Sequence, residues 1–186
     1  KVHRETTAQE VLRDTGRKLD AFVAGVGTGG TVTGVGQVLK KETPKTLIVA
    51  VEPVESTVLK GGTHSPHKIQ GIGAGFVPSI YDPKVVDRII DVKHEDAVNL
   101  TRRLSKEEGI FVGISSGAVT WAAIEIAREL GKGKRVVAVL ASTAFGVTVV
   151  TTNSCQIVTA PGSINFAYAS FQTTSAASST TFSARC

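Results

Sequence analysis

The fold is decided by residues 20–31, which read Asp20-Ala21-Phe22-Val23-Ala24-Gly25-Val26-Gly27-Thr28-Gly29-Gly30-Thr31. Asp20–Val26 is a compact apolar run beside glycines, the pattern of a strand buried on both faces. A Gly/Thr turn follows, and residues 32–41 have the pattern of a helix. Glycines let the backbone turn sharply and approach a ligand, and amide groups at the start of a helix attract a phosphate. The stretch therefore predicts a strand, an anion-binding turn and a helix; a tight turn that binds nothing is the alternative.

Strands and helices alternate outward from this turn, over residues 1–140. The other predicted strands are Leu47–Val51, Val85–Val92 and Arg135–Leu140; the other predicted helices are a short one capped by Thr6 or Thr7, one over His94–Glu108 and one from Ser115 to about Leu130. Residues 54–80 are irregular and rich in glycine. Alternation of this kind predicts an α/β fold with a doubly wound, mainly parallel sheet and helices on both faces.

The net charge of +5 invites comparison with nucleic-acid-binding proteins. However, the basic residues are scattered through helical stretches (Lys40–Lys41, Arg102–Arg103, Lys132–Arg135) and alternate with acids, which is typical of solvated faces. The two cysteines and four histidines lack metal-ligand spacing. No run approaches membrane-spanning length, and the first residues form no apolar signal segment. We expect a cytoplasmic protein with no metal, no nucleic acid and no membrane partner.

The composition changes near residue 141. The last acidic residue is Glu129, and residues 141–186 are rich in Ser, Thr and Ala, with Arg185 as their only formal charge. Residues 1–140 are therefore predicted to form one domain, followed by a tail of a different kind. The tail either forms short strands, over Val147–Val150 and Gln156–Val158, or is disordered or foreign sequence, as an altered reading frame would produce. We favour the second interpretation.

The glycine turn alone leaves the ligand open. Gly25, Gly27 and Gly30 match G-x-G-x-x-G, the fingerprint of dinucleotide-binding proteins. Glu52 ends the next strand near the position of a ribose-binding acid. A dinucleotide-dependent oxidoreductase is therefore one interpretation of this motif.

Two further motifs favour another ligand. Residues 68–78 form a glycine-alternating loop, Lys-Ile-Gln-Gly-Ile-Gly-Ala-Gly-Phe-Val-Pro, which has no role in dinucleotide binding. Residues 113–117 read Gly-Ile-Ser-Ser-Gly at a junction between an apolar segment and a helix. Ser115 or Ser116 is either a helix N-cap, worth about 1 kcal/mol, or one serine caps while its neighbour faces a ligand.

The order of these three motifs resembles cysteine synthase, also called O-acetylserine sulfhydrylase, a family of fold type II pyridoxal-phosphate enzymes with a fold like that of tryptophan synthase β. The resemblance rests on residues 27–31, on 67–76 (His-Lys-Ile-Gln-Gly-Ile-Gly-Ala-Gly-Phe) and on 113–118, and it covers residues 1–140. It implies that Gly27, Thr28, Gly29, Gly30 and Thr31 hold the phosphate of pyridoxal 5'-phosphate, that Ser115 bonds the pyridine nitrogen, and that Gln70, Gly71, Ile72 and Gly73 line the substrate side. A neutral hydroxyl partner leaves that nitrogen largely unprotonated, which suits β-elimination over transamination.

The resemblance also implies a reaction and partners. The family replaces the acetate of O-acetylserine with sulfide to give L-cysteine, acts as a homodimer, and binds the C-terminal peptide of serine acetyltransferase in its cleft. Its Schiff-base lysine stands in a Ser-x-Lys-Asp-Arg context that this chain lacks, so we assign no catalytic residue and expect the chain alone to be inactive. A non-catalytic module that binds the acetyltransferase peptide is the third interpretation.

Overall fold

The computed structural model describes residues 1–141, so the two strands proposed for the tail lie outside the described residues. The elements, in chain order, are α1 (Val2–Glu5), α2 (Thr7–Asp14), β1 (Ala21–Gly25), α3 (Gly30–Glu42), β2 (Leu47–Pro53), β3 (Arg88–Val92), α4 (His94–Glu107), α5 (Ile114–Leu130) and β4 (Val136–Ala138). Two short 3-10 turns, Val58–Lys60 and Pro83–Val85, lie between β2 and β3.

The strands form one parallel sheet in the order β3-β2-β1-β4. The chain builds outward from β1 to β2 and β3, and then returns to add β4 on the other side of β1. Strand order therefore reverses between β1 and β4. In open parallel sheets the crevice at such a reversal, beyond the carboxyl ends of the strands, is the usual place for a ligand.

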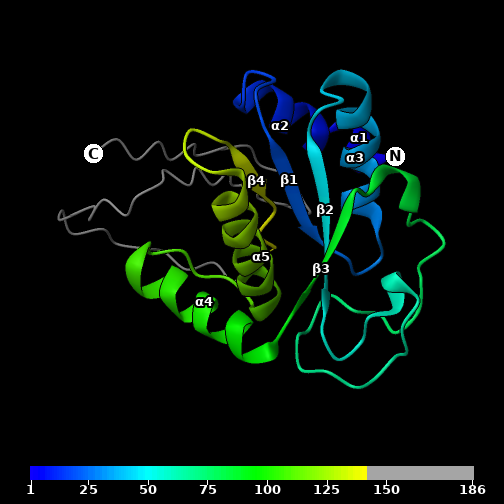
Figure 1. The fold of residues 1–186 in the computed structure, drawn as a ribbon, viewed down its shortest axis with the longest axis vertical. Helices are drawn as coiled ribbons and strands as arrows, with labels where there is room; N and C mark the ends of the chain where they lie inside the picture. The colour runs from blue at the N-terminus through cyan, green and yellow to red at the C-terminus, as the bar shows by residue number, and fades with distance from the viewer. Residues whose placement is uncertain (142–186) are drawn as a thin grey trace, which may run out of the picture.

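Helices cover both faces of the sheet, as Figure 1 shows. Ala21 and Val23 of β1 belong to the core shared with α4 and α5, whereas Phe22 and Ala24 belong to the core shared with α2 and α3. Successive side chains of a strand point to opposite faces, so a strand buried on both faces is apolar throughout. The predicted doubly wound α/β fold is confirmed.

Helices α4 and α5 pack closely because α5 carries a glycine at their contact. A Cβ on Gly117 would lie 2.1 Å from the carbonyl oxygen of Ala97 and 2.2 Å from Oγ1 of Thr101. Both distances are far shorter than a van der Waals contact, so only glycine allows this approach. The hairpin of α4 and α5 lies beside the sheet in Figure 1.

Element boundaries differ from the predicted ones where local side-chain bonds intervene. Strand β3 begins at Arg88 and not at Val85, because Pro83 and the Asp82 side chain, which accepts a bond from the Lys84 amide (3.0 Å), form a 3-10 turn first. Helix α1 was not predicted. Within residues 1–141, no helix is long and apolar enough to cross a membrane.

Candidate functional site

A cavity of about 560 Å³ opens beyond the carboxyl ends of β1 and β4. It lies where the strand order reverses, and its volume falls in the range of small-molecule sites. Its walls contain residues from all three sequence motifs: Gly27, Thr28, Gly29, Gly30 and Thr31; Gly71 and Ile72; and Ser115 and Ser116. Segments as far apart in sequence as the β1–α3 turn and the start of α5 therefore meet around one space.

The turn between β1 and α3 forms one wall of the cavity. Gly29 has φ of +80°, a left-handed conformation that glycine adopts without strain, and α3 begins at the next residue. The first amide groups of a helix have no acceptor within the helix and carry the positive end of its dipole. Thr28 and Thr31 add hydroxyl groups beside these amides. The wall is therefore suited to a phosphate group.

The turn after β1 packs closely against the loop that contains Gly71 and Ile72. A Cβ on Gly27 would lie 2.5 Å from the carbonyl oxygen of Gly71, and a Cβ on Gly25 would lie 2.6 Å from Cγ2 of Ile72. Any side chain at these positions would displace the loop around Gly71. The glycines thus bring the second motif into the wall of the cavity.

The start of α5 forms the opposite wall. The N-cap residue is Gly113, so neither serine caps the helix and the N-cap interpretation of Ser115 and Ser116 is wrong. Ser116 is buried and its hydroxyl donates to the carbonyl oxygen of Ala141 (2.7 Å). Ser115 lines the cavity, and a Cβ on Gly71 would lie 3.4 Å from its Oγ. Both serines line the cavity, and the hydroxyl of Ser116 is already engaged in a structural bond.

His3 is a candidate that the sequence reasoning missed. Its Nε2 lies 3.3 Å from Oγ1 of Thr31, and its Nδ1 lies 3.1 Å from Oγ1 of Thr7. Burial lowers the pKa of His3, as does the positive chain terminus, and this favours the neutral ring. His3 connects α1 to the first turn of α3 and orients a hydroxyl of the cavity wall. The spacing of this histidine in the sequence carries no signal for the contact.

Two of the residues predicted on the substrate side are not in the cavity wall. Gln70 is exposed and does not line the cavity. Gly73 lies behind the wall, where its amide donates to the carbonyl of Val26 (2.9 Å) and its carbonyl accepts from Nε2 of His67 (2.8 Å). In this conformation Gly73 supports the glycine loop, while Gly71 and Ile72 face the cavity.

The position of Glu52 bears on the dinucleotide interpretation. Its side chain is 0% exposed and lines a separate narrow hollow, and the cavity wall does not include it. A ribose-binding acid has to reach the ligand with its carboxylate. The geometry therefore does not favour a dinucleotide.

The rim of the cavity is apolar and exposed. Phe76 and Ile80 line the cavity while remaining 64% and 60% exposed. None of the lysines of the chain lines the cavity, and all of them lie within residues 1–141. The same residues contain no group of three His, Cys, Asp or Glu side chains that could hold a metal ion.

Comparison with known proteins identifies a family. Residues 2–142 match the family described as pyridoxal-phosphate dependent enzyme. Cysteine synthases of several Staphylococcus aureus strains are 56% identical over 142 residues, which make up 76% of this chain and 46% of theirs. The chain thus spans less than half the length of these curated relatives.

Solved structures agree with this relationship. The crystal structure of cysteine synthase from Entamoeba histolytica superposes with a TM-score of 0.71 at 45% identity, covering 73% of this chain and 40% of that one. The crystal structure of O-ureido-L-serine synthase superposes with a TM-score of 0.73 at 46% identity, covering 76% and 45%. From its motifs, its fold and these relatives, the chain belongs to the pyridoxal-phosphate dependent enzymes, as its resemblance to the cysteine synthases predicts.

Proposed function

We propose that the cavity binds pyridoxal 5'-phosphate and that the protein takes part in making L-cysteine from O-acetylserine and sulfide. The observation that carries this proposal is the meeting of the 27–31 turn and Ser115 around one cavity, between the N-termini of α3 and α5. A phosphate on the amides of the turn and a heteroaromatic ring reaching toward the Ser115 hydroxyl fit that arrangement.

The residues of the cavity suit this cofactor in three respects. Backbone amides at the start of α3 match a phosphate dianion. The cavity, at about 560 Å³, has room for a small flat ring, and the glycines at positions 25, 27 and 71 line it without side chains. The Ser115 hydroxyl is a neutral partner for a ring nitrogen, and it stands in the first turn of α5, where the helix dipole disfavours a positive charge.

Each part of the wall has a distinct task in this proposal. Pyridoxal phosphate supplies the electron sink for removing the leaving group from the β-carbon of an amino acid. The 27–31 turn anchors its phosphate, Ser115 keeps the ring nitrogen from gaining a proton, and Gly71 and Ile72 pack beside the substrate. Gln70 and Gly73 remain proposed as substrate-side residues that approach the ligand only if the 68–78 loop moves.

A binding titration tests the proposal directly. Pyridoxal 5'-phosphate is titrated into the 186-residue chain while absorbance and intrinsic fluorescence are followed, with pyridoxal, which lacks the phosphate, as the comparison ligand. We expect saturable binding of the phosphate form, and a roughly threefold to tenfold weaker affinity in Thr31→Ala because one hydroxyl donor is lost. Thr63→Ala is the matched control, since Thr63 is exposed and lies outside the cavity wall.

The same titration separates this proposal from its alternatives. Equal affinity for pyridoxal and its phosphate, or an unchanged affinity in Thr31→Ala, contradicts the assignment of the turn. Saturable NADH binding that Thr31→Ala weakens, without binding of the pyridoxal compound, supports the dinucleotide interpretation instead.

We propose the family's partners as well. The exposed apolar rim formed by Phe76 and Ile80 is the feature that favours an acetyltransferase peptide as a second ligand of the cavity. Phe76→Ser should then weaken binding of a synthetic C-terminal peptide of serine acetyltransferase, and an unchanged affinity argues against it. Homodimer formation and a cytoplasmic location complete the proposal and are tested by analytical ultracentrifugation and cell fractionation.

A further inference from the structure

Glu52 is a buried acid that the proposed function does not use. It is the penultimate residue of β2, its side chain is 0% exposed, and it lines a narrow hollow together with Gly27 and Gly73. The hollow is too small to admit a water molecule. Its Oε2 accepts a bond from the Leu59 amide (2.9 Å), and its Oε1 has no hydrogen-bond partner among residues 1–141.

The hollow lies directly behind the wall of the large cavity. Gly27, Ala74, Phe76 and Pro78 line both spaces. Glu52 and Gly27 line the hollow together, and Gly27 also lines the large cavity. The amide of Gly73 donates to the carbonyl of Val26 (2.9 Å), so a hydrogen bond joins the two loops where they line the hollow.

The positively charged groups near Glu52 do not fully neutralise its carboxylate. Asp91 is its register partner on β3 and pairs with Lys60 (2.7 Å), so the nearest ammonium group already has a carboxylate partner. Tyr81 packs against Gly29, and burial and the charge of Glu52 both raise the pKa of its hydroxyl. His67 lies one step further away, bonded to the carbonyl of Gly73.

Burial is the main reason that the pKa of Glu52 is raised, and the negative Asp91 raises it further. The Leu59 amide and the charge and amide of Lys60 oppose this shift without cancelling it. The unpartnered Oε1 also raises the pKa of Glu52, because the hollow has no room for water and the ionised carboxylate would be left without solvation. The neutral form of the carboxyl group is thus favoured by geometry.

We propose that Glu52 is a positioning residue that sets the phosphate affinity of the cavity through its protonation: ionised Glu52 places a negative charge behind the 27–31 turn that binds the phosphate, and neutral Glu52 does not. The inference rests on the proposed function, because it concerns the same turn. It predicts that a phosphate monoester binds more weakly as Glu52 loses its proton.

The experiment compares the wild-type chain with Glu52→Gln, which keeps the shape and an acceptor for the Leu59 amide but cannot ionise. The affinity for pyridoxal 5'-phosphate is measured at several pH values from about 5 to about 8.5. We expect the ratio of the two affinities to change by roughly threefold to tenfold across this range, with the variant binding more tightly at high pH. The ligand's own titration cancels in that ratio.

A second measurement makes the result independent of the variant. The carboxyl carbon of Glu52 is followed by NMR in ¹³C-glutamate-labelled wild-type chain, with and without the ligand. We expect it to titrate above the ordinary range for glutamate, and to titrate still higher with the ligand bound, since protonation and phosphate binding favour each other.

The outcomes are distinguishable. Parallel pH profiles for the two proteins, or a Glu52 pKa in the ordinary range, overturn the inference and leave the proposed function standing. Failure of both proteins to bind the phosphate compound at any pH overturns the proposed function, and the inference with it.

Discussion

At the scale of single residues, the site depends on where a side chain is absent. The carbonyl oxygen of Gly71 lies 2.5 Å from the position that a Cβ on Gly27 would occupy. We expect Gly27→Ala to displace the 68–78 loop and to lower the free energy of unfolding by about 2 kcal/mol, because backbone atoms cannot move aside as a flexible side chain does. Chemical denaturation measures this loss.

The matched control is Gly30→Ala, in the same turn. There the nearest heavy atom to the added Cβ is Cδ2 of His3, at 3.5 Å, an ordinary van der Waals distance. Gly30 is also the first residue of α3, where alanine is a better helix former. Its stability should change by no more than about 0.5 kcal/mol. Equal losses in both variants would show that crowding by Gly71 is not the cause.

The residues that could be predicted from the sequence were those whose function depends on the backbone. Glycines 27, 29 and 30 stand in a strand–turn–helix pattern, so their place at the start of a helix could be inferred from order alone. The contact of His3 with Thr31 spans 28 residues and depends on how α1 packs on α3. Nothing in the spacing of a single histidine indicates such a partner.

At the scale of elements, the closest contact is between α4 and α5. A Cβ on Gly117 would lie 2.1 Å from the carbonyl oxygen of Ala97, which belongs to the backbone of α4. We expect Gly117→Ala to push the two helices apart and to lower the free energy of unfolding by about 3 kcal/mol. Because Ser115 stands two residues earlier in α5, ligand affinity should fall as well.

The control for this variant is Asn99→Ala on the exposed side of α4, with an expected change within about 0.5 kcal/mol. Urea denaturation of both variants measures the difference. A Gly117→Ala protein as stable as the wild type would mean that the two helices can separate at little cost in free energy. The close contact at Gly117 would then not contribute to stability.

Elements with an uninterrupted pattern were predicted nearly to the residue. The expected helix over His94–Glu108 is observed as His94–Glu107, and the expected strand Leu47–Val51 extends to Pro53. The last strand, expected over Arg135–Leu140, is observed only as Val136–Ala138. The other errors fall where local bonds compete with the pattern. Val85 is apolar enough for a strand, but Pro83 and the Asp82 side chain bond set a 3-10 turn before it. The Ser-Ser pair likewise suggests an N-cap, whereas Gly113 takes that position.

At the scale of the whole molecule, the sheet order determines where chemistry is possible. Because β1 and β4 are neighbours although β2 and β3 lie between them in sequence, the turn after β1 and the segment after β4 open onto one crevice. Asp20 links the amino ends of β1 and β4. Its carboxylate accepts hydrogen bonds from the Arg135 amide (2.8 Å) and from the Lys134 side chain (3.0 Å). The Arg135 amide is the main reason that the pKa of Asp20 is lowered.

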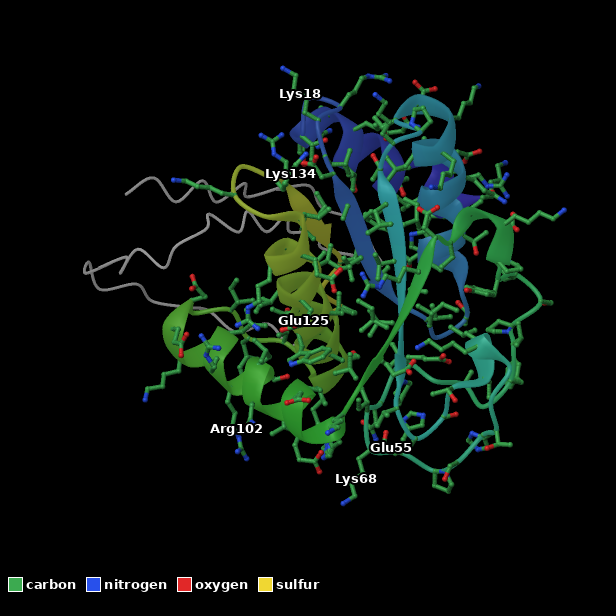
Figure 2. All side chains as sticks on the ribbon, in the orientation of Figure 1. Lys18, Glu55, Lys68, Arg102, Glu125 and Lys134 are labelled. Atoms are coloured by element: carbon green, nitrogen blue, oxygen red, sulfur yellow. The ribbon has the colours of Figure 1, made fainter. Side chains whose placement is uncertain are left out.

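The charges are distributed over the surface rather than gathered in one patch. Lys18 and Lys134 lie at one end of the molecule and Lys68 and Glu55 at the other (Figure 2). The basic stretches noted in the sequence also contain ion pairs, among them Lys40–Asp87 (2.6 Å), Arg103–Glu107 (3.0 Å) and Lys134–Asp20 (3.0 Å). Ion pairing of this kind is typical of solvated faces.

The last prediction concerns the activity of the chain. Covalent attachment of pyridoxal phosphate and removal of the substrate's α-proton both require a lysine at the cofactor, and no lysine of this chain lines the cavity. Lys68 opens the 68–78 glycine loop, yet its side chain points away from the molecule in Figure 2, while the neighbouring Ile69 is buried. We therefore expect the 186-residue chain to bind pyridoxal phosphate without turning over O-acetylserine and sulfide.

Two measurements check this expectation together. Cysteine formation is followed with purified chain, pyridoxal phosphate, O-acetylserine and sulfide, against free cofactor as the background and a complete Staphylococcus aureus cysteine synthase as the positive control. Borohydride reduction followed by peptide mass spectrometry shows whether any lysine has bonded to the cofactor. Cysteine formation above the background, together with one specifically modified lysine, would mean that the glycine loops rearrange to bring a lysine into the cavity. The 27–31 turn would then anchor an active cofactor, and the cavity geometry described above would be that of a resting conformation.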